Sequence, residues 1–198
     1  MNKPPIKTYE QFVHRFGEIN RKLNKIVGPL GAKVTIKRDK ELRVAPGCRQ
    51  QFYSFSGYYD TATEDIRLFV HFPSNRKTFK FTKTNYKGLV FMFSQIVQHE
   101  FIHQSQYAFR PEQSDRLVKV HHSDRLSKPR LKQIEYLSSW CEIEAYAHDV
   151  ALEMVLLSPS TSFTKALSVM QQQSIECATS YNVFTQSFAN VPEHPAMK

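Results

Sequence analysis

A single long helix is the strongest structural expectation that the sequence supports. The segment from Tyr86 to Arg110 contains no proline and only one early glycine, and it stops at Pro111, as helices commonly do just before a proline. Its apolar residues would point around nearly the whole circumference of a helix. A helix of that kind is buried in a core rather than lying on a surface, so the chain is expected to fold around it.

Three polar residues, His99, Glu100 and His103, interrupt this apolar helix. The two histidines are four positions apart and therefore project from the same side of a helix. Two imidazoles so placed can bind one zinc ion, and the glutamate after the first can act on metal-bound water. Buried polar side chains need partners. The sequence thus predicts a zinc site here, with hydrogen-bonded core histidines as the alternative.

A second long helix is expected from Pro129 or Arg130 to Leu157, before Ser158-Pro159. At 100° steps, Glu144 falls on the apolar face, whereas Glu142 points away from it. A carboxylate beside a buried pair of histidines completes a His₂Glu catalytic zinc site. Glu144 is therefore predicted as the third ligand, with an ordinary salt bridge as the alternative. The residues assigned to the apolar face are Ile134, Leu137, Cys141, Glu144, Ala145, His148, Leu152 and Val155, and those assigned to the solvated face are Glu135, Glu142, Asp149 and Glu153.

His148 lies one turn beyond Glu144 on the same predicted face. It is a candidate catalytic residue, as a partner of a metal ligand or as a donor to bound substrate, and a structural hydrogen bond is the alternative. The oxyanion of a peptidase is usually stabilised by a Tyr or His donor. The sequence does not choose among the candidates for that role, which are Tyr107, Tyr136, Tyr146, His121, His122 and His148.

His99-Glu-x-x-His103, followed by a distant glutamate on a second helix, resembles the zincin metallopeptidases in their gluzincin arrangement. The run Glu142-Ile-Glu144-Ala145-Tyr-Ala147 is similar to the glutamate motif of ImmA/IrrE-type peptidases and of small phage-encoded peptidases. The resemblance covers the two helices only. It implies that His99, His103 and Glu144 hold zinc and that Glu100 is the general base.

The mechanism implied by this resemblance is hydrolysis of a peptide bond in a protein substrate. Zinc held by three ligands keeps a fourth position for water and lowers the pKa of that water toward about 7. Glu100 would take the proton of this water and return it to the leaving amine.

The rest of the sequence predicts an α+β fold, with a small, mostly antiparallel sheet packed on the buried helix and on the second helix. Thr8 to Val27 has the spacing of an amphipathic helix. Strands are expected at Val34–Ile36, Leu42–Val44, Phe52–Tyr59 and Ile66–Phe72, and another helix at Phe163–Ala178, with a loose tail after Val191. In zincins an edge strand beside the metal helix binds substrate, and Asp65–Phe72 is the candidate, with a plain core strand as the alternative.

Composition limits the remaining possibilities. A chain of 198 residues fits a single domain, expected to span residues 1–198, and can bury a core without disulfides. Cys48, Cys141 and Cys177 are widely spaced and contain no Cys-x-x-Cys pair, which favours reduced thiols and argues against a zinc ribbon. The N-terminal residues lack the apolar run of a signal peptide, and no stretch reaches the roughly 18 apolar residues of a membrane span, so neither is expected. The cytoplasm, of the host cell if the protein is phage-encoded, is the expected compartment.

The net charge of +9 raises a different class of function. The segment 76–87 alternates basic with aromatic residues, a composition suited to contacts with phosphates and bases. A nucleic acid or a DNA-associated protein is therefore a possible partner, with a solvated basic loop as the alternative. In this second hypothesis the protein binds nucleic acid or another partner, and its metal site is structural or vestigial. Glu100 favours the peptidase, because a purely structural zinc site has no use for a general base.

Overall fold

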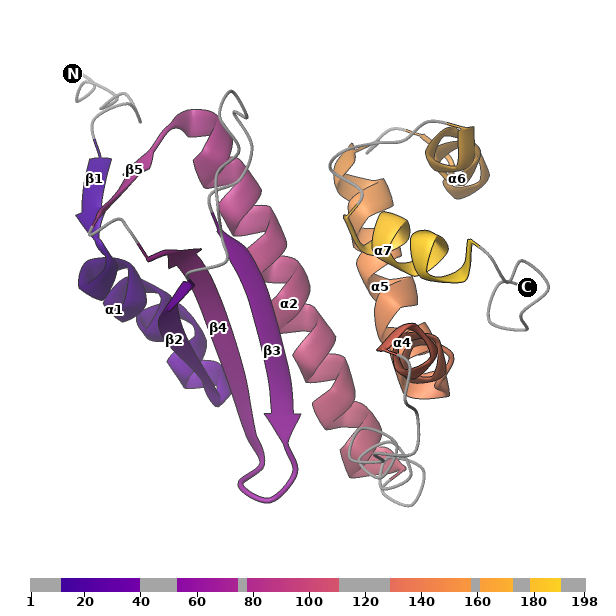
Figure 1. Ribbon diagram of the computed structural model, residues 1–198, viewed down its shortest axis with the longest axis horizontal. Coiled ribbons are helices and arrows are strands. Elements are labelled where there is room, and N and C mark those ends of the chain that lie inside the picture. Colours follow the sequence, from indigo (N-terminus) through magenta and orange to yellow (C-terminus); the bar gives the residue numbers. More distant parts are fainter. Residues whose placement is uncertain are drawn as a thin grey trace, which may run out of the picture. The chain divides into compact units, whose positions relative to one another are not determined.

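The computed structural model describes residues 12–39, 53–74, 78–110, 129–157, 161–172 and 179–189, and these form an α+β fold (Figure 1). This class agrees with the sequence prediction. The chain divides into two compact units, Met1–Glu100 and Phe101–Lys198. The division falls inside helix α2 (Lys83–Phe109), which is the long helix expected before Pro111. The expectation of a single domain stays a prediction.

A three-stranded sheet forms the centre of the first unit. Its strands are β2 (Ala32–Asp39), β3 (Ser54–Asp60) and β4 (Asp65–Pro73), in the order β2-β4-β3. β4 runs antiparallel to β3 and parallel to β2. The sheet is therefore mixed, whereas the sequence predicted a mostly antiparallel one, because a hydrophobic pattern does not report strand direction.

β4 provides the core of this sheet. Its alternate residues Ile66, Leu68, Val70 and Phe72 are at most 1% exposed, so one face is buried as the alternation predicted. Of the two alternatives for this segment, the plain core strand is confirmed and the edge strand is excluded, because β2 and β3 pair with the two sides of β4. Alternation reports which face of a strand is buried, whereas the position in a sheet depends on pairing with distant segments.

The first helix is shorter than its apolar spacing predicted. α1 runs from Phe16 to Val27, while Phe12–Arg15 forms strand β1. β1 pairs antiparallel with β5 (Thr78–Phe81). This partner is distant in the sequence, so local spacing could not reveal the pairing. The expected helix start, at 8–11, and the expected strand at 42–44 lie outside the described residues.

The outer side of β2 is paired by a side chain of α1. Asn24 Nδ2 donates to the carbonyl oxygen of Val34 at 2.8 Å, and Asn24 Oδ1 accepts from the backbone N–H of Val34 at 2.9 Å. The amide thus substitutes for a neighbouring strand at this position, which protects an otherwise exposed sheet edge. A 3₁₀ turn, η2 (Gly28–Leu30), leads from α1 into β2 through Gly31, whose φ of 76° suits glycine.

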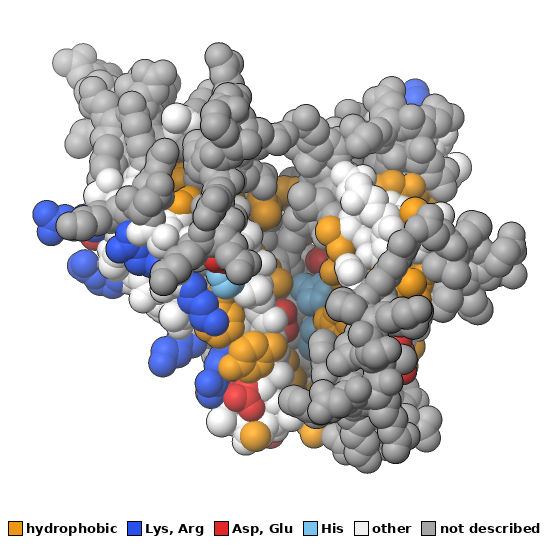
Figure 2. Space-filling model, viewed as in Figure 1, with side chains coloured by type: hydrophobic (Ala, Val, Ile, Leu, Met, Phe, Trp, Pro, Cys, Tyr) orange, Lys and Arg blue, Asp and Glu red, His pale blue; other side chains and the backbone are white. Residues whose placement is uncertain are grey.

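The face of the sheet opposite to its buried residues carries basic and aromatic side chains. Lys33 and Arg67 are cross-strand neighbours, and so are Arg67 and Tyr58. Lys37 Nζ lies 3.7 Å from the centroid of the Phe69 ring, and this ring stacks on Tyr58 at 5.9 Å. Figure 2 shows Lys and Arg side chains beside hydrophobic ones on the part of the molecule that carries these strands.

Helices form the described part of the second unit beyond α2: α4 (Pro129–Leu137), α5 (Trp140–Leu157), α6 (Phe163–Gln172) and α7 (Thr179–Phe188). The sequence predicted one helix where α4 and α5 now lie, and it did not predict α7. α4 ends in a turn in which the Ser139 N–H donates to the carbonyl oxygen of Tyr136 at 3.1 Å. This turn separates α4 from α5.

In the part of the chain that the structure describes, no helix combines the length and the apolar character needed to cross a membrane.

Candidate metal centre

Three potential ligands come together where α2 meets the first turn of α5. Each of His99, His103 and Glu142 offers one ligand atom, and these atoms all lie within 4.8 Å of one another. His103 Nε2 is 3.2 Å from Glu142 Oε1. Two ligands of one tetrahedral zinc, each roughly 2.0–2.1 Å from the metal, would be about 3.3 Å apart. Two imidazoles and a carboxylate are also a donor set that zinc commonly takes, so these residues fit the metal.

Burial sets this group apart from an ordinary surface cluster. His99 is 7% exposed and Glu142 is 3% exposed. Buried ionisable groups are costly unless they are paired or bind a metal. The arrangement therefore combines donor atoms with the low solvent exposure that favours metal coordination.

The start of α5 explains why Glu142 can be held there. Ser139 precedes the first helical residue, and its Oγ accepts from the backbone N–H of Glu142 at 3.4 Å. Ser at this position caps the helix, and a glutamate three residues later is typical of a capped helix start. The partial positive charge of the helix N-terminus also favours a carboxylate in the first turn.

The sequence predicted the buried face of α5 only in part. Cys141 and Ala145 are at most 1% exposed, as expected, but Glu142, predicted to be solvated, is 3% exposed, and the side chain of Glu144, predicted to be buried, is 43% exposed. Among the described residues, the group of potential ligands contains Glu142 and not Glu144. The prediction for Glu142 was wrong because it placed every acid beside the apolar stripe in solvent, whereas Glu142 has a partner on another helix, His103.

Two further acids of α5, which the sequence also assigned to its solvated face, are buried for a separate reason. Glu153, 0% exposed, accepts from the backbone N–H groups of Ser180 at 2.7 Å and Tyr181 at 3.2 Å. Asp149, 4% exposed, accepts from the Ser180 hydroxyl at 3.5 Å. Both donors belong to the first turn of α7, whose N–H groups have no partners within the helix. The acids were assigned to solvent because their partners lie on a helix that was not predicted.

His148 is exposed on α5, so its predicted place on a buried face was wrong. Its catalytic role stays a prediction. Tyr107, Tyr136 and Tyr146 are partly buried, and the choice of an oxyanion donor among them also stays open. His121 and His122 lie outside the described residues.

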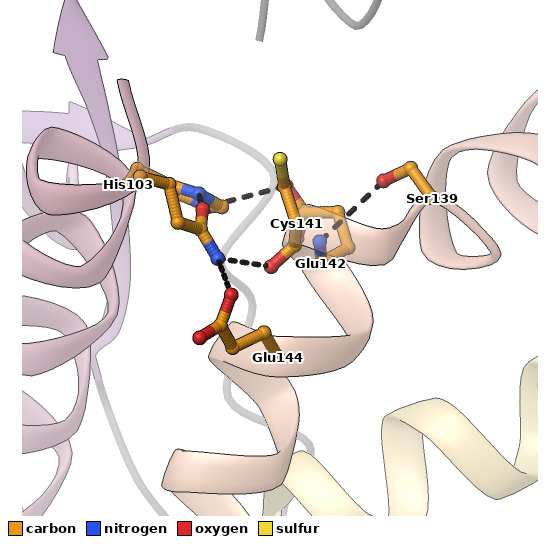
Figure 3. Close-up of polar contacts among 6 residues, drawn as sticks. His103, Ser139, Cys141, Glu142 and Glu144 are labelled. Atoms are coloured by element: carbon orange, nitrogen blue, oxygen red, sulfur yellow. Dashed lines mark hydrogen bonds and ion pairs between the residues drawn. The ribbon is translucent and has the colours of Figure 1, made fainter. Parts of the chain in front are cut away.

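Sequence reasoning missed Gln106, which is buried on α2 one turn beyond His103. Its Oε1 lies 2.9 Å from His103 Nδ1. Figure 3 shows His103 pointing toward the first turn of α5, which carries Cys141, Glu142 and Glu144. The available signal was the spacing of three residues between His103 and Gln106, which places both on one side of the helix.

No protein-family model, curated protein or solved structure matches this chain. The resemblance to zincins therefore stays a prediction based on residues of two helices.

Glu100 contacts the sheet of the first unit through Gly57 on β3. Glu100 is 3% exposed. A Cβ placed on Gly57 would lie 2.8 Å from Glu100 Oε1 and 2.9 Å from Glu100 Cγ, both shorter than a normal contact. The absence of a side chain at position 57 is thus what lets the Glu100 side chain lie against the strand.

The basic segment 76–87 is not a single loop. Its residues Arg76 and Lys77 lie outside the described residues, while Thr78–Phe81 forms strand β5 and α2 begins at Lys83. Binding of nucleic acid by this segment stays a prediction.

Proposed function

We propose that this protein is a zinc-dependent peptidase with a protein substrate. The observation that carries the proposal is the buried group of His99, His103 and Glu142, with ligand atoms within 4.8 Å of one another, directly beside Glu100 in the sequence. Among the described residues the group has three ligands, the number typical of catalytic sites, whereas structural zinc sites are usually closed by four protein ligands. This comparison supports an enzyme.

In this proposal the two imidazoles and the Glu142 carboxylate hold the metal. Bound zinc would supply a Lewis acid and a water of lowered pKa. The Glu100 carboxylate takes a proton from the attacking water and returns it to the leaving amine. Because Glu100 follows His99 directly, it projects from α2 about 100° away from that ligand, so it can act beside the metal without being a ligand itself.

We also propose that β3 receives the substrate as an added strand. Two observations support this choice. β3 is an edge of the three-stranded sheet, and the opposite edge, β2, is already paired by Asn24. Gly57 in the middle of β3 contacts Glu100, so a peptide paired along this edge would run close to the general base. Strand addition is a common way to bind an extended peptide without strict sequence specificity.

The metal part of the proposal is tested by elemental analysis of protein purified without chelator. We expect about one zinc per chain, lost in His99→Ala and in His103→Ala. Exposed His148→Ala is the matched control and should retain zinc. A wild-type protein that carries no zinc and takes up none when zinc is added would overturn the proposal.

The catalytic part is tested with Glu100→Gln, which keeps the size of the side chain but removes the base. With casein and a host-cell lysate as substrates, followed by mass spectrometry of the products, we expect at least about a 10²-fold loss of cleavage with zinc retained. Exposed Glu135→Gln should cleave normally. Identical cleavage by wild type and Glu100→Gln would exclude the mechanism, and a zinc-loaded wild type that cleaves nothing would favour a structural metal site.

A further inference from the structure

The side chain of Gln106 connects His103 to two groups of α5. Its Oε1 is 2.9 Å from His103 Nδ1, and its Nε2 is 3.0 Å from both the carbonyl oxygen of Cys141 and Oε2 of Glu144. Gln106 is 6% exposed, so water cannot easily replace these bonds. All four residues belong to the second unit.

The contacts of Gln106 determine which way its amide points. The oxygen and nitrogen ends of an amide have almost the same shape and must be assigned from their partners. The Cys141 carbonyl and the Glu144 carboxylate only accept hydrogen bonds, so the NH₂ group, with its two donors, must face them. A reversed amide would set its oxygen against two other oxygens. The Gln106 oxygen therefore faces His103.

The orientation of the amide in turn decides the protonation of His103. An amide oxygen only accepts hydrogen bonds, so in this contact His103 Nδ1 carries a hydrogen and donates it to Gln106 Oε1. An imidazole that binds a metal is neutral and has one N–H group, so with the hydrogen on Nδ1 it is His103 Nε2 that offers its lone pair to the metal. Nε2 is the atom that lies 3.2 Å from Glu142 Oε1. The lone pair is thus on the nitrogen that faces the candidate metal position.

We propose that Gln106 is a positioning residue, which holds His103 as its Nδ1–H tautomer with Nε2 ready to bind zinc, and that Glu144 serves the site by orienting Gln106. This proposal rests on the zinc site proposed above. A ligand histidine whose other nitrogen donates a hydrogen bond is fixed in ring orientation and is a more basic ligand. Glu144, predicted from the sequence to bind zinc directly, acts here through Gln106.

The test is Gln106→Leu, which removes the acceptor and keeps a buried side chain of similar size. We expect zinc affinity, measured by competition with a chromophoric chelator, to fall about 10–100-fold. Nitrogen-15 NMR of the zinc-loaded protein, with His103 assigned by comparison with His103→Gln, should show the hydrogen on Nδ1 and zinc on Nε2 in wild type, and a mixture of the two arrangements in Gln106→Leu. A loss of packing alone would change stability and leave the tautomer unaltered.

Two variants complete the design. Gln104→Leu makes the same change on the same helix, two residues away, and should alter neither zinc affinity nor tautomer. If Gln106→Leu does not fold, Gln106→Asn serves in its place. Its side chain is shorter by one methylene, so the amide no longer reaches His103, and zinc affinity and the tautomer should change in the same way.

The outcomes separate this inference from the proposed function. Zinc binding and tautomer unchanged in both Gln106→Leu and Gln106→Asn would overturn the role of Gln106 while leaving the zinc site intact. A wild-type protein that binds no zinc would overturn the proposed function and, with it, this inference. A wild-type His103 with its proton on Nε2 would overturn the inference directly.

Discussion

The Nε2 atom of His103 lies 3.2 Å from the Oε1 atom of Glu142, and the two residues come from the last part of α2 and the first turn of α5. This separation suits two ligands of one metal ion. The two glutamates of the run Glu142-Ile-Glu144 have different partners, because Glu142 faces His103 and Glu144 accepts a hydrogen bond from Gln106.

Glu142→Ala should weaken zinc binding more than Glu144→Ala does. Loss of a residue that holds a metal ligand in place typically lowers metal affinity about 10–100-fold. The zinc affinity of Glu144→Ala should fall within that range, whereas Glu142→Ala, which removes a ligand itself, should lose more. Zinc affinities from chelator competition give the order. Equal losses, or a greater loss in Glu144→Ala, would show that Glu142 is not the third ligand.

Gly57→Ala should destabilise the protein, because the new Cβ would lie 2.8 Å from Glu100 Oε1 and force that side chain to move. Overpacking of this kind commonly costs about 1–3 kcal/mol. Urea unfolding followed by circular dichroism measures the effect. The control is Gly17→Ala on α1, where nothing lies within 4 Å of the added Cβ and where alanine should be neutral or slightly stabilising.

Glu153→Gln should destabilise the second unit. The Ser180 N–H donates to Glu153 Oε1 and the Tyr181 N–H donates to Glu153 Oε2 at the start of α7. In Glu153→Gln one of these oxygens becomes an NH₂ group, which cannot accept, so one bond is lost and the other becomes neutral. A hydrogen bond to a charged group contributes about 1.5–3 kcal/mol, so the expected loss is at least about 2 kcal/mol, visible in the urea midpoint. Exposed Glu135→Gln is the control, and an equal change in both variants would contradict the capping role of Glu153.

The pKa of His71 should lie below its usual value of 6.5, first because burial disfavours the charged ring and second because Lys37 repels its charge, although Asp39 opposes the shift. As the pH falls through 6.5 and below, the unfolded chain binds more protons at His71 than the folded chain does. The free energy of unfolding therefore decreases toward acid pH. Proton NMR titration of the His71 ring measures this pKa. Lys37→Gln should raise it only in part, because burial remains, and a pKa above 6.5 in wild type would contradict the prediction.

Much of the first unit and of the helix α2 could be predicted from the sequence. The alternation at Ile66, Leu68 and Val70 correctly indicated a strand with one buried face, since successive side chains of a strand point to opposite sides. Pro111 correctly indicated where α2 ends. The pairing of Phe12–Arg15 with Thr78–Phe81 was not predictable, because the apolar spacing near Phe12 also fits a helix.

The sequence alone determined that His99 and His103 share one side of a helix, because four residues of a helix make about one turn wherever the helix lies. Only the tertiary structure decided which glutamate faces them. The buried acids of α5 find their partners on α2 and α7. A helical period relates neighbours within one helix, whereas the burial of a charged residue depends on partners that other segments bring to it.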